Sequence, residues 1–381
     1  MMYQILQGDC LETLKSLPEC SVQTCVTSPP YYRLRDYGVD GQIGLEQSPE
    51  EYIDKLVSVF REVRRVLKDD GTLWLNLGDS YNGSGGAGGD YSPGGLKEGQ
   101  PKYPGRNEKS LKPKDLMMMP ARVALALQAD GWWLRSEIVW HKPNPMPESV
   151  TDRPTKSHEM IYLLAKSAKY FYDYVAIQEP AAYDGRKDEQ FKGSAKYKDS
   201  GQTFAEQGHP RWNKNADGLR VRNKRDVWTV VTKSYREAHF ATYNPDLIEP
   251  CILAGTSAKG ECPKCGKAWA RVVEKETSYD HVTSADGKSK IGPYANQTGN
   301  GEGTHDIRHG VFSTTTTTGW QPQCECGEQP VPQKVLDPFN GSGTTGEVSI
   351  KHGRNYIGCE LNPAYIELTH KRLAEVQPAM M

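Results

Sequence analysis

Short apolar runs alternate with amphipathic stretches over the first part of the chain. Residues 22–27 form a run rich in β-branched side chains, which predicts a strand. This strand must end at Ser28-Pro29-Pro30, because prolines cannot continue a central strand. From Ile53 to Leu67, apolar residues recur at spacings of three and four, which predicts a helix with one buried face. Ser48 is the expected N-cap of this helix, with Glu51 completing a capping box, and Asp70-Gly71 is its expected end.

The same alternation continues after longer interruptions. Further strands and helices are expected, in chain order, at residues 72–77, 116–129, 137–140, 160–164, after Asn244-Pro245, and at 335–336, 347–351 and 356–359. Because strands and helices alternate, the core is predicted to be an α/β sheet.

Three polar segments interrupt this core. Residues 81–113 contain eight glycines from Gly83 to Gly99, followed by several basic residues. Such a segment buries little apolar surface, so it is expected to be a mobile loop. The predicted organisation is a core made of residues 1–180, 236–259 and 331–381, with insertions at 181–235 and 260–330.

Composition and charge leave this picture unchanged. The 381 residues carry a formal net charge of −1, with 36% hydrophobic and 25% charged residues, as is ordinary for a globular protein. No apolar run reaches the roughly 18 residues that a membrane span needs, and the N-terminus lacks the pattern of a secretory signal. The nine cysteines comprise five single residues and two close pairs, which favours a reducing cytoplasm over a disulfide framework.

A glycine-containing turn follows the expected strand at 335–336. The segment Asp337-Pro338-Phe339-Asn340-Gly341-Ser342-Gly343-Thr344-Thr345 leads into a helix, whose start offers free N–H groups. Glu360 ends the next strand, where a carboxylate can accept both hydroxyls of a ribose. The pattern is neither G-x-G-x-x-G nor a P-loop. It predicts a nucleoside site, with a plain tight turn as the alternative.

A proline motif ends the strand at residues 22–27. In Thr27-Ser28-Pro29-Pro30-Tyr31-Tyr32 the prolines lack N–H donors and leave their carbonyls as unpaired acceptors. A serine oxygen and a proline carbonyl together can accept both hydrogens of an amino group, and Tyr31 offers a flat face for a base. By itself the motif is also compatible with a turn that ends a strand.

Together the two motifs resemble those of the DNA amino-methyltransferases of the permuted β class. In that family an [S/D/N]-P-P-[Y/F/W] motif comes first and a D-P-F-x-G-S-G-T motif comes near the end, as at residues 27–32 and 337–345 here. Residues 7–11 also resemble the family's G-D-C-L segment. Residues 239–245 resemble its H-F-A-T-x-P segment, with one extra residue before the proline.

The resemblance implies a Rossmann-like sheet with circularly permuted motif order that binds S-adenosylmethionine. The residues that it implies at the cofactor are Asp9, Phe240, Thr242, Asp337, Pro338, Phe339, Gly341, Gly343, Thr344, Glu360 and Asn362. The catalytic residues that it implies are Ser28, Pro29, Pro30 and Tyr31. The target base would be flipped into the pocket, where Ser28 and the Pro29 carbonyl hold its amino hydrogens while the nitrogen attacks the methyl group in line.

Ser28 bears on the choice of base. In the family, serine at this position is commoner in enzymes that methylate cytosine at N4, whereas aspartate or asparagine is commoner in those that methylate adenine at N6. The expected function is therefore site-specific methylation of cytosine N4 in DNA, with adenine N6 as the alternative. Cys251, in the only Pro-Cys pair, is expected to pack in the core and not to act as a nucleophile.

A basic cluster lies in the insertion at 181–235. It comprises Arg211, Lys214, Arg220, Arg222, Lys224 and Arg225. We expect it to contact double-stranded DNA, with a solvated face as the alternative. The loop at 81–113 is then either a linker or a loop that closes over DNA. The resemblance implies a methyltransferase of a bacterial or phage cytoplasm, and it leaves open a homodimer and a separate restriction endonuclease.

The two close cysteine pairs predict a structural zinc site. They are Cys262 with Cys265 and Cys324 with Cys326, and a glycine follows each pair. C-x-x-C-G is typical of a zinc knuckle, and four thiolates close a tetrahedral Zn²⁺ site without an open position for chemistry. Such a site would hold residues 260–330 as a zinc-ribbon-like insertion. A knuckle without metal is the alternative.

Two other classes of protein remain compatible with parts of the sequence. A methyltransferase that acts on protein or RNA can use the same proline motif, but the basic cluster favours duplex DNA. A zinc-containing DNA-binding protein without enzymatic activity would not need the cofactor turn beside the proline motif.

Overall fold

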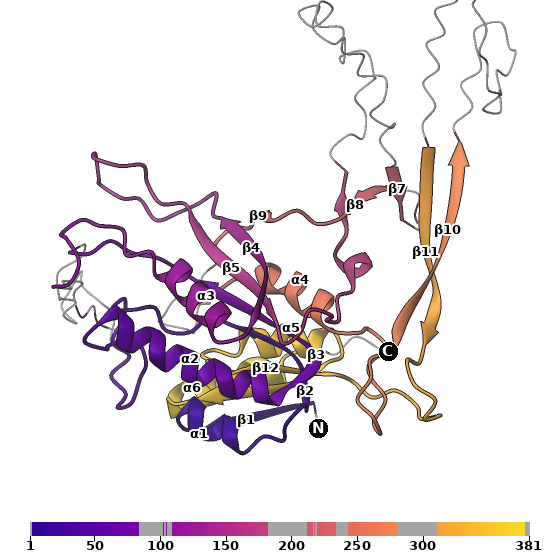
Figure 1. The fold of residues 1–381 in the computed structure, drawn as a ribbon, viewed down its shortest axis with the longest axis horizontal. Helices are drawn as coiled ribbons and strands as arrows, with labels where there is room; N and C mark the ends of the chain where they lie inside the picture. Colours follow the sequence, from indigo (N-terminus) through magenta and orange to yellow (C-terminus); the bar gives the residue numbers. More distant parts are fainter. Residues whose placement is uncertain are drawn as a thin grey trace, which may run out of the picture. The chain divides into compact units, whose positions relative to one another are not determined.

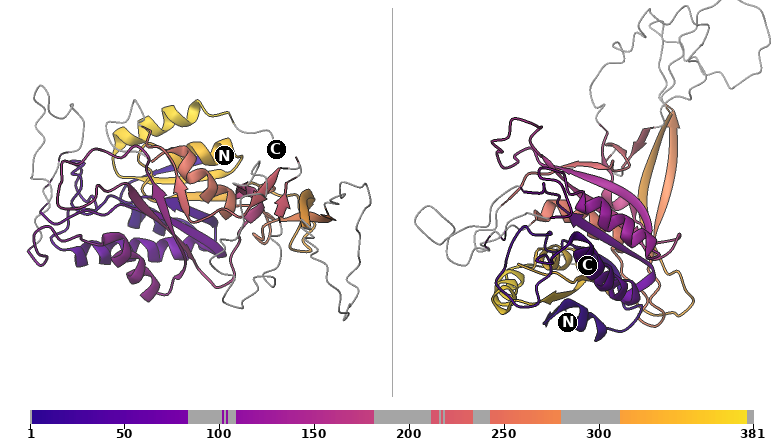
Figure 2. Two further views of the ribbon diagram at one scale, coloured as in Figure 1. Left: turned by 90° about the horizontal axis from the view of Figure 1, so that it is seen from above. Right: turned by 60° about the vertical axis from the view of Figure 1, so that its left-hand side comes forward.

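The computed structural model describes most of the chain, which divides into two compact units (Figures 1 and 2). Unit 1 comprises residues 1–177, 225–270 and 322–381, and unit 2 comprises residues 178–224 and 271–321. The described residues are 2–83, 102, 104, 109–181, 212–215, 217, 219–233, 243–279 and 311–377. Arg211, Phe240, Thr242 and most of the predicted loop at 81–113 lie outside them.

Unit 1 is built around an eight-stranded sheet in the order β1-β13-β12-β2-β3-β5-β4-β9. The strands are β1 (Tyr3–Gln7), β2 (Val22–Thr27), β3 (Leu67–Leu77), β4 (Trp133–His141), β5 (His158–Ala165), β9 (Val227–Thr229), β12 (Lys334–Asp337) and β13 (Asn355–Glu360). The first five strands in the sheet order run parallel, and β5 is antiparallel to both of its neighbours. The predicted α/β sheet, with its permuted motif order, is confirmed.

Helices cover both faces of this sheet (Figure 2). They are α1 (Cys10–Lys15), α2 (Pro49–Val66), α3 (Met119–Ala129), α4 (Pro245–Gly255), α5 (Thr344–Lys351) and α6 (Pro363–Ala374), with a 3-10 helix η1 (Tyr174–Ile177). Apolar residues of α1, α2 and α3 pack with Leu73 and Leu75, and those of α4, α5 and α6 pack in a second cluster with Trp74. Alternate residues of β3 therefore pack into two apolar clusters on opposite faces of the sheet. Within the described ranges, none of the helices has the length and apolar character that a bilayer crossing requires.

The predicted helix start at Ser48 is confirmed, but two other helix limits are wrong. Ser48 Oγ accepts from Glu51 N at 3.2 Å, and Gln47 N donates to the Glu51 carboxylate at 3.1 Å. Helix α2 ends at Val66 and not at Asp70-Gly71, because Leu67 already pairs with Val22 as the first residue of β3. Helix α3 begins at Met119 and not near residue 116, with a proline in its first turn.

Unit 2 contains a five-stranded sheet in the order β10-β11-β7-β8-β6. Its strands are β6 (Glu179–Pro180), β7 (Trp212–Lys214), β8 (Arg220–Arg222), β10 (Ala270–Tyr279) and β11 (Val311–Gln321). Because β11 pairs with β7, parts of both predicted insertions share one sheet. The compact units therefore divide the chain differently from the predicted segments, and the cysteine pairs fall in unit 1.

The capping interaction of α2 can be tested by replacing Ser48 with alanine. The variant loses the acceptor for Glu51 N, so we expect the free energy of unfolding to fall by about 1 kcal/mol in denaturant titrations followed by circular dichroism. Ser58→Ala is the matched control, because that hydroxyl only bonds back to Asp54 O within the helix. Equal losses in both variants would contradict the capping role.

Candidate active site

A cavity of about 730 Å³ in unit 1 brings together three segments that are far apart in sequence. The predicted site residues that line it are Asp9, Ser28, Pro29, Pro30, Tyr31, Pro338, Phe339, Gly341, Thr344, Glu360 and Asn362. They meet because β2, β12 and β13 are parallel neighbours, so their carboxyl ends lie at one edge of the sheet. The volume is in the range of ligand-binding cavities.

Asp337 does not line this cavity, although it belongs to the predicted cofactor motif. Its side chain is only 1% exposed and accepts four hydrogen bonds. The donors are Thr27 Oγ1 at 2.6 Å, Thr345 Oγ1 at 2.7 Å, Tyr243 OH at 3.1 Å and Phe339 N at 3.0 Å. Burial raises the pKa of Asp337, and the hydroxyl donors oppose that shift. This carboxylate joins the end of β2 to the turn after β12.

Glu360 occupies the opposite side of the same turn. Its two oxygens accept from Gly341 N at 2.7 Å and from Asn362 N at 2.8 Å. Burial raises the pKa of Glu360 to about 7, against the lowering effect of these N–H donors. Each oxygen retains a further lone pair for a ligand in the cavity.

The two glycines of the turn have different surroundings. Gly341 has a φ of +53° and lines the cavity, whereas Gly343 does not line it. Gly343 has a φ of +76°, and a Cβ there would approach Thr369 Cγ2 to 2.7 Å. Glycine at 343 is thus required by the close packing of α6. Asp9, in contrast, lines the cavity and also caps α1, accepting from Leu11 N at 2.8 Å.

The proline motif presents fewer unpaired acceptors than predicted. Tyr52 OH donates to the Pro30 carbonyl at 2.8 Å, so the prediction that both proline carbonyls are unpaired is wrong for Pro30. The Tyr31 ring lies against the backbone just after β3, where a Cβ at Gly78 would come within 2.5 Å of Tyr31 Cε2. A side chain at residue 78 would therefore displace the ring.

Several residues that line the cavity were not predicted from the sequence. They are Asn76, Lys142, Lys156, Glu159 and Tyr243. Lys142 follows one strand, and Glu159 lies near the start of the next. The only available signal was that the ends of an antiparallel pair must meet, and the sequence pattern alone did not establish that pairing.

The basic cluster is only partly described. Residues Lys214 and Arg220 are paired in register between β7 and β8. Arg222 donates its Nε to Glu179 at 2.8 Å, so that guanidinium already has an acidic partner within unit 2. Lys224 belongs to unit 2 and Arg225 to unit 1. Contact of this cluster with DNA stays a prediction.

The four paired cysteines converge in unit 1. The sulfurs of Cys262, Cys265, Cys324 and Cys326 all lie within 4.8 Å of one another. A tetrahedral zinc site with Zn–S bonds of about 2.3 Å has sulfur–sulfur edges of about 3.8 Å, so the cluster fits a structural zinc ion. An N–H from Lys267 lowers the pKa of Cys265, whereas neighbouring thiols raise the pKa of Cys324 and of Cys326.

Backbone contacts hold the two halves of this cluster together. Glu261 and Val331 exchange hydrogen bonds of 2.9 and 2.8 Å, which places the chain before the first pair beside the chain after the second. Lys68 of β3 pairs with Glu261 and donates to the Gly266 carbonyl at 2.8 Å. The cysteine cluster is thereby attached to the central sheet.

Comparisons with known proteins agree with this arrangement. A family model described as DNA methylase matches residues 22–261 and 330–371. The chain is 38% identical over 376 residues to the type II methyltransferase M.Cfr9I of Citrobacter freundii, covering 97% of this chain and 87% of that protein. It is 35% identical over 373 residues to M.SmaI of Serratia marcescens, covering 97% of this chain and 90% of that protein.

The fold is shared with a solved structure of another protein. It is a PvuII DNA methyltransferase described as cytosine-N4-specific, with a TM-score of 0.53 and 16% identity, covering 100% of this chain and 89% of that one.

Replacing Asp337 with alanine tests its role in joining the two motifs. The change removes a buried acceptor that serves four donors, so we expect the free energy of unfolding to fall by about 2–4 kcal/mol. Asp69→Ala is the control, since the Asp69 side chain is 89% exposed. Denaturant titration measures both variants, and an Asp337→Ala protein as stable as wild type would argue against this role.

The cysteine cluster predicts one zinc ion per chain. Elemental analysis of protein purified under reducing conditions should find it, and Cys265→Ser should lose the metal and lower the melting temperature by about 5 °C or more. Cys20→Ser is the control, because Cys20 is an exposed free cysteine outside the cluster. Wild-type protein without zinc would refute the assignment.

Proposed function

The chain belongs to the N6/N4 family of DNA methylases, and on that basis we propose that it transfers a methyl group from S-adenosylmethionine to the N4 amino group of a cytosine in DNA. The observation that carries the proposal is the single cavity shared by the proline motif and the turn after β12. One cavity can then hold the methyl donor beside the group that receives the methyl.

The residues on the β12 side fit S-adenosylmethionine. Glu360 has a free lone pair on each oxygen and accepts the ribose hydroxyls. Phe339 and Pro338 contribute apolar surface to the cavity, and Asp9 is proposed to lie at the adenine. When bound, S-adenosylmethionine supplies a methyl group that its sulfonium charge activates.

The residues on the β2 side fit an amino group carried by a flipped base. Ser28 Oγ and the Pro29 carbonyl accept its two hydrogens, while the Tyr31 ring stacks on the base. No covalent intermediate with the base is required. In agreement with this, Cys251 is 1% exposed and packs in the apolar core. Serine at the position of Ser28 is commoner in the cytosine-N4 enzymes of the family, and on that ground we propose cytosine N4 over adenine N6.

We further propose double-stranded DNA as the partner. The basic cluster and the family membership support this, and the relatives named type II methyltransferases support a role in a restriction–modification system. A separate restriction endonuclease would then recognise the same site.

Product analysis tests the proposed function directly. The chain is incubated with S-adenosylmethionine and genomic DNA from a bacterium that lacks DNA methylation, and the nucleosides are separated by mass spectrometry. We expect N4-methylcytosine. If the product is N6-methyladenine, the target base is adenine and not cytosine. The absence of any methylated nucleoside would refute DNA methylation.

Substitutions in the proline motif should separate catalysis from cofactor binding. Ser28→Ala is expected to lower the single-turnover rate by about 100-fold, because one acceptor for the amino group is lost. Tyr31→Ala should weaken the hold on the flipped base by about 1–3 kcal/mol. Both variants should bind S-adenosylmethionine like wild type in calorimetric titrations. Wild-type single-turnover rates in both variants would show that the proline motif takes no part in the reaction.

The raised pKa of Glu360 predicts a pH-dependent cofactor affinity. Ribose hydroxyls donate to the ionised carboxylate, so binding lowers the pKa and releases a proton wherever the free carboxyl is protonated. Because the pKa of Glu360 is about 7, affinity should rise from about pH 6 to about pH 8 and then level off. Glu360→Gln should bind more weakly and lose this rise. The same slope in the glutamine variant would exclude Glu360 as its source.

A further inference from the structure

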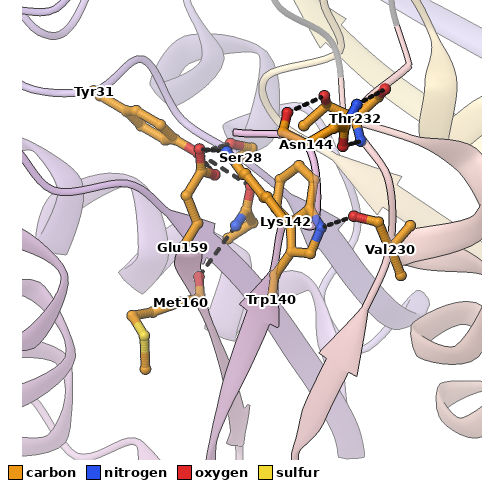
Figure 3. A network of polar contacts seen from close by, with 10 residues as sticks. Ser28, Tyr31, Trp140, Lys142, Asn144, Glu159, Met160, Val230 and Thr232 are labelled. Atoms are coloured by element: carbon orange, nitrogen blue, oxygen red, sulfur yellow. Dashed lines mark hydrogen bonds and ion pairs between the residues drawn. The ribbon is translucent and has the colours of Figure 1, made fainter. Parts of the chain in front are cut away.

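The Tyr31 hydroxyl is the centre of a polar network inside the cavity (Figure 3). It donates to Glu159 Oε2 at 2.7 Å and contacts Asn76 Oδ1 at 3.1 Å. The amide of Asn76 is oriented by its Nδ2, which donates to the Met160 carbonyl at 3.1 Å. Glu159 Oε2 and Asn76 Oδ1 are therefore both acceptors, and the single hydrogen of Tyr31 is directed toward this pair.

This arrangement determines what Ser28 can do. Ser28 Oγ lies 3.4 Å from Tyr31 OH and is the donor of that contact, because the phenol hydrogen is already committed. The lone pairs of Ser28 Oγ then remain for a ligand in the cavity. The contact is long for an O–H···O bond, as catalytic hydrogen bonds often are before the substrate binds.

Glu159 is itself held in place from the other side. Its second oxygen forms an ion pair with Lys142, and these side chains are only 17% and 18% exposed, respectively. The Lys142 ammonium lies 4.2 Å from the centre of the Trp140 ring, and Trp140 Nε1 donates to the Val230 carbonyl at 2.8 Å. Trp140 and Glu159 are paired in register between β4 and β5. The Glu159 carboxylate is thus held in place by contacts from two hydrogen-bonded strands, β4 and β5.

The phenol also stays protonated under ordinary conditions. Burial raises the pKa of Tyr31 well above its usual range, and the charge of Glu159 raises it further. Tyr31 is consequently a donor to Glu159 and never a phenolate that would repel it.

A serine at residue 28 needs a partner that fixes the direction of its hydroxyl hydrogen, whereas a carboxylate there would not. A carboxylate only accepts hydrogen bonds, but a hydroxyl can turn its hydrogen toward the amino group and cease to be an acceptor. We propose that Glu159 is a positioning residue for methyl transfer. Through the Tyr31 hydroxyl, it keeps the Ser28 hydrogen turned away from the cavity, so that Ser28 Oγ accepts from the amino group of the target base. This inference rests on the proposed function.

A cycle of two substitutions tests the proposal. Tyr31→Phe keeps the ring but removes the hydroxyl. Glu159→Gln keeps the size, but its amide oxygen turns to Lys142 and its N–H competes with Ser28 for the phenol oxygen. Single-turnover methylation of unmethylated bacterial DNA is measured for wild type, both single variants and the double variant.

We expect each single variant to be about 10- to 100-fold slower, with unchanged affinity for S-adenosylmethionine and for DNA. The double variant should be no slower than Tyr31→Phe alone, because Glu159 acts only through that hydroxyl. The matched controls are Glu137→Gln and Tyr162→Phe. Tyr162 OH donates to Glu137 at 3.3 Å on the same two strands, outside the cavity lining, so these variants should keep the wild-type rate.

Three outcomes would overturn the proposal. Wild-type rates in Tyr31→Phe and Glu159→Gln show that the network is not used. Losses that multiply in the double variant show that Glu159 acts independently of Tyr31. Equal losses in the Glu137 and Tyr162 controls show a general effect on the strands. If the Glu159→Gln protein is unstable, the single-turnover rate of Tyr31→Phe decides whether the proposal holds, and a wild-type rate overturns it. Failure of the proposed function is distinguishable, because wild type would then methylate no DNA or Ser28→Ala would be as fast as wild type.

Discussion

The buried carboxylate of Asp337 is the interaction on which the candidate active site depends. Its donors come from the end of β2, from the turn after β12, from α5 and from the residue that precedes the N-cap of α4. Thr27 and Asp337 are 310 residues apart in sequence. A buried carboxylate is costly unless its oxygens are hydrogen-bonded, so it is stable only when all of these segments have assembled.

The order of strands explains how motifs at opposite ends of the chain form one site. Strands β12 and β13 lie between β1 and β2 in the sheet, although they come last in the sequence. Neighbours in a sheet are selected by hydrogen bonding and packing, and the position of a strand along the chain matters little once loop closure is achieved. The proline motif and the glycine-containing turn after β12 thus follow adjacent strands at the same edge of the sheet.

The cysteine cluster lies where the long segment between α4 and β12 leaves the core and returns to it. The paired backbone of Glu261 and Val331 brings the chain back beside itself, and the four sulfurs gather next to that point. The chain then returns to the core at Gln333, whose side chain contacts both Ser257 N and Gln23. Strands β10 and β11 of the intervening segment belong to the five-stranded sheet of unit 2.

The sequence by itself determined the features that depend on residues close together along the chain. These include the N-cap at Ser48, the strand that ends at the proline motif, the glycine-containing turn after β12 and the four cysteines that converge. It did not determine the end of α2 at Val66, the hydrogen bond that occupies the Pro30 carbonyl, the burial of Asp337 away from the cavity, the pairing of β11 with β7, or the placement of Glu159 beside Tyr31. Each of these depends on a partner distant in sequence. Periodicity and motif spacing reflect interactions among residues close together in sequence, such as a helix cap or a turn. Which distant donor, acceptor or strand pairs with a segment is decided by the tertiary structure.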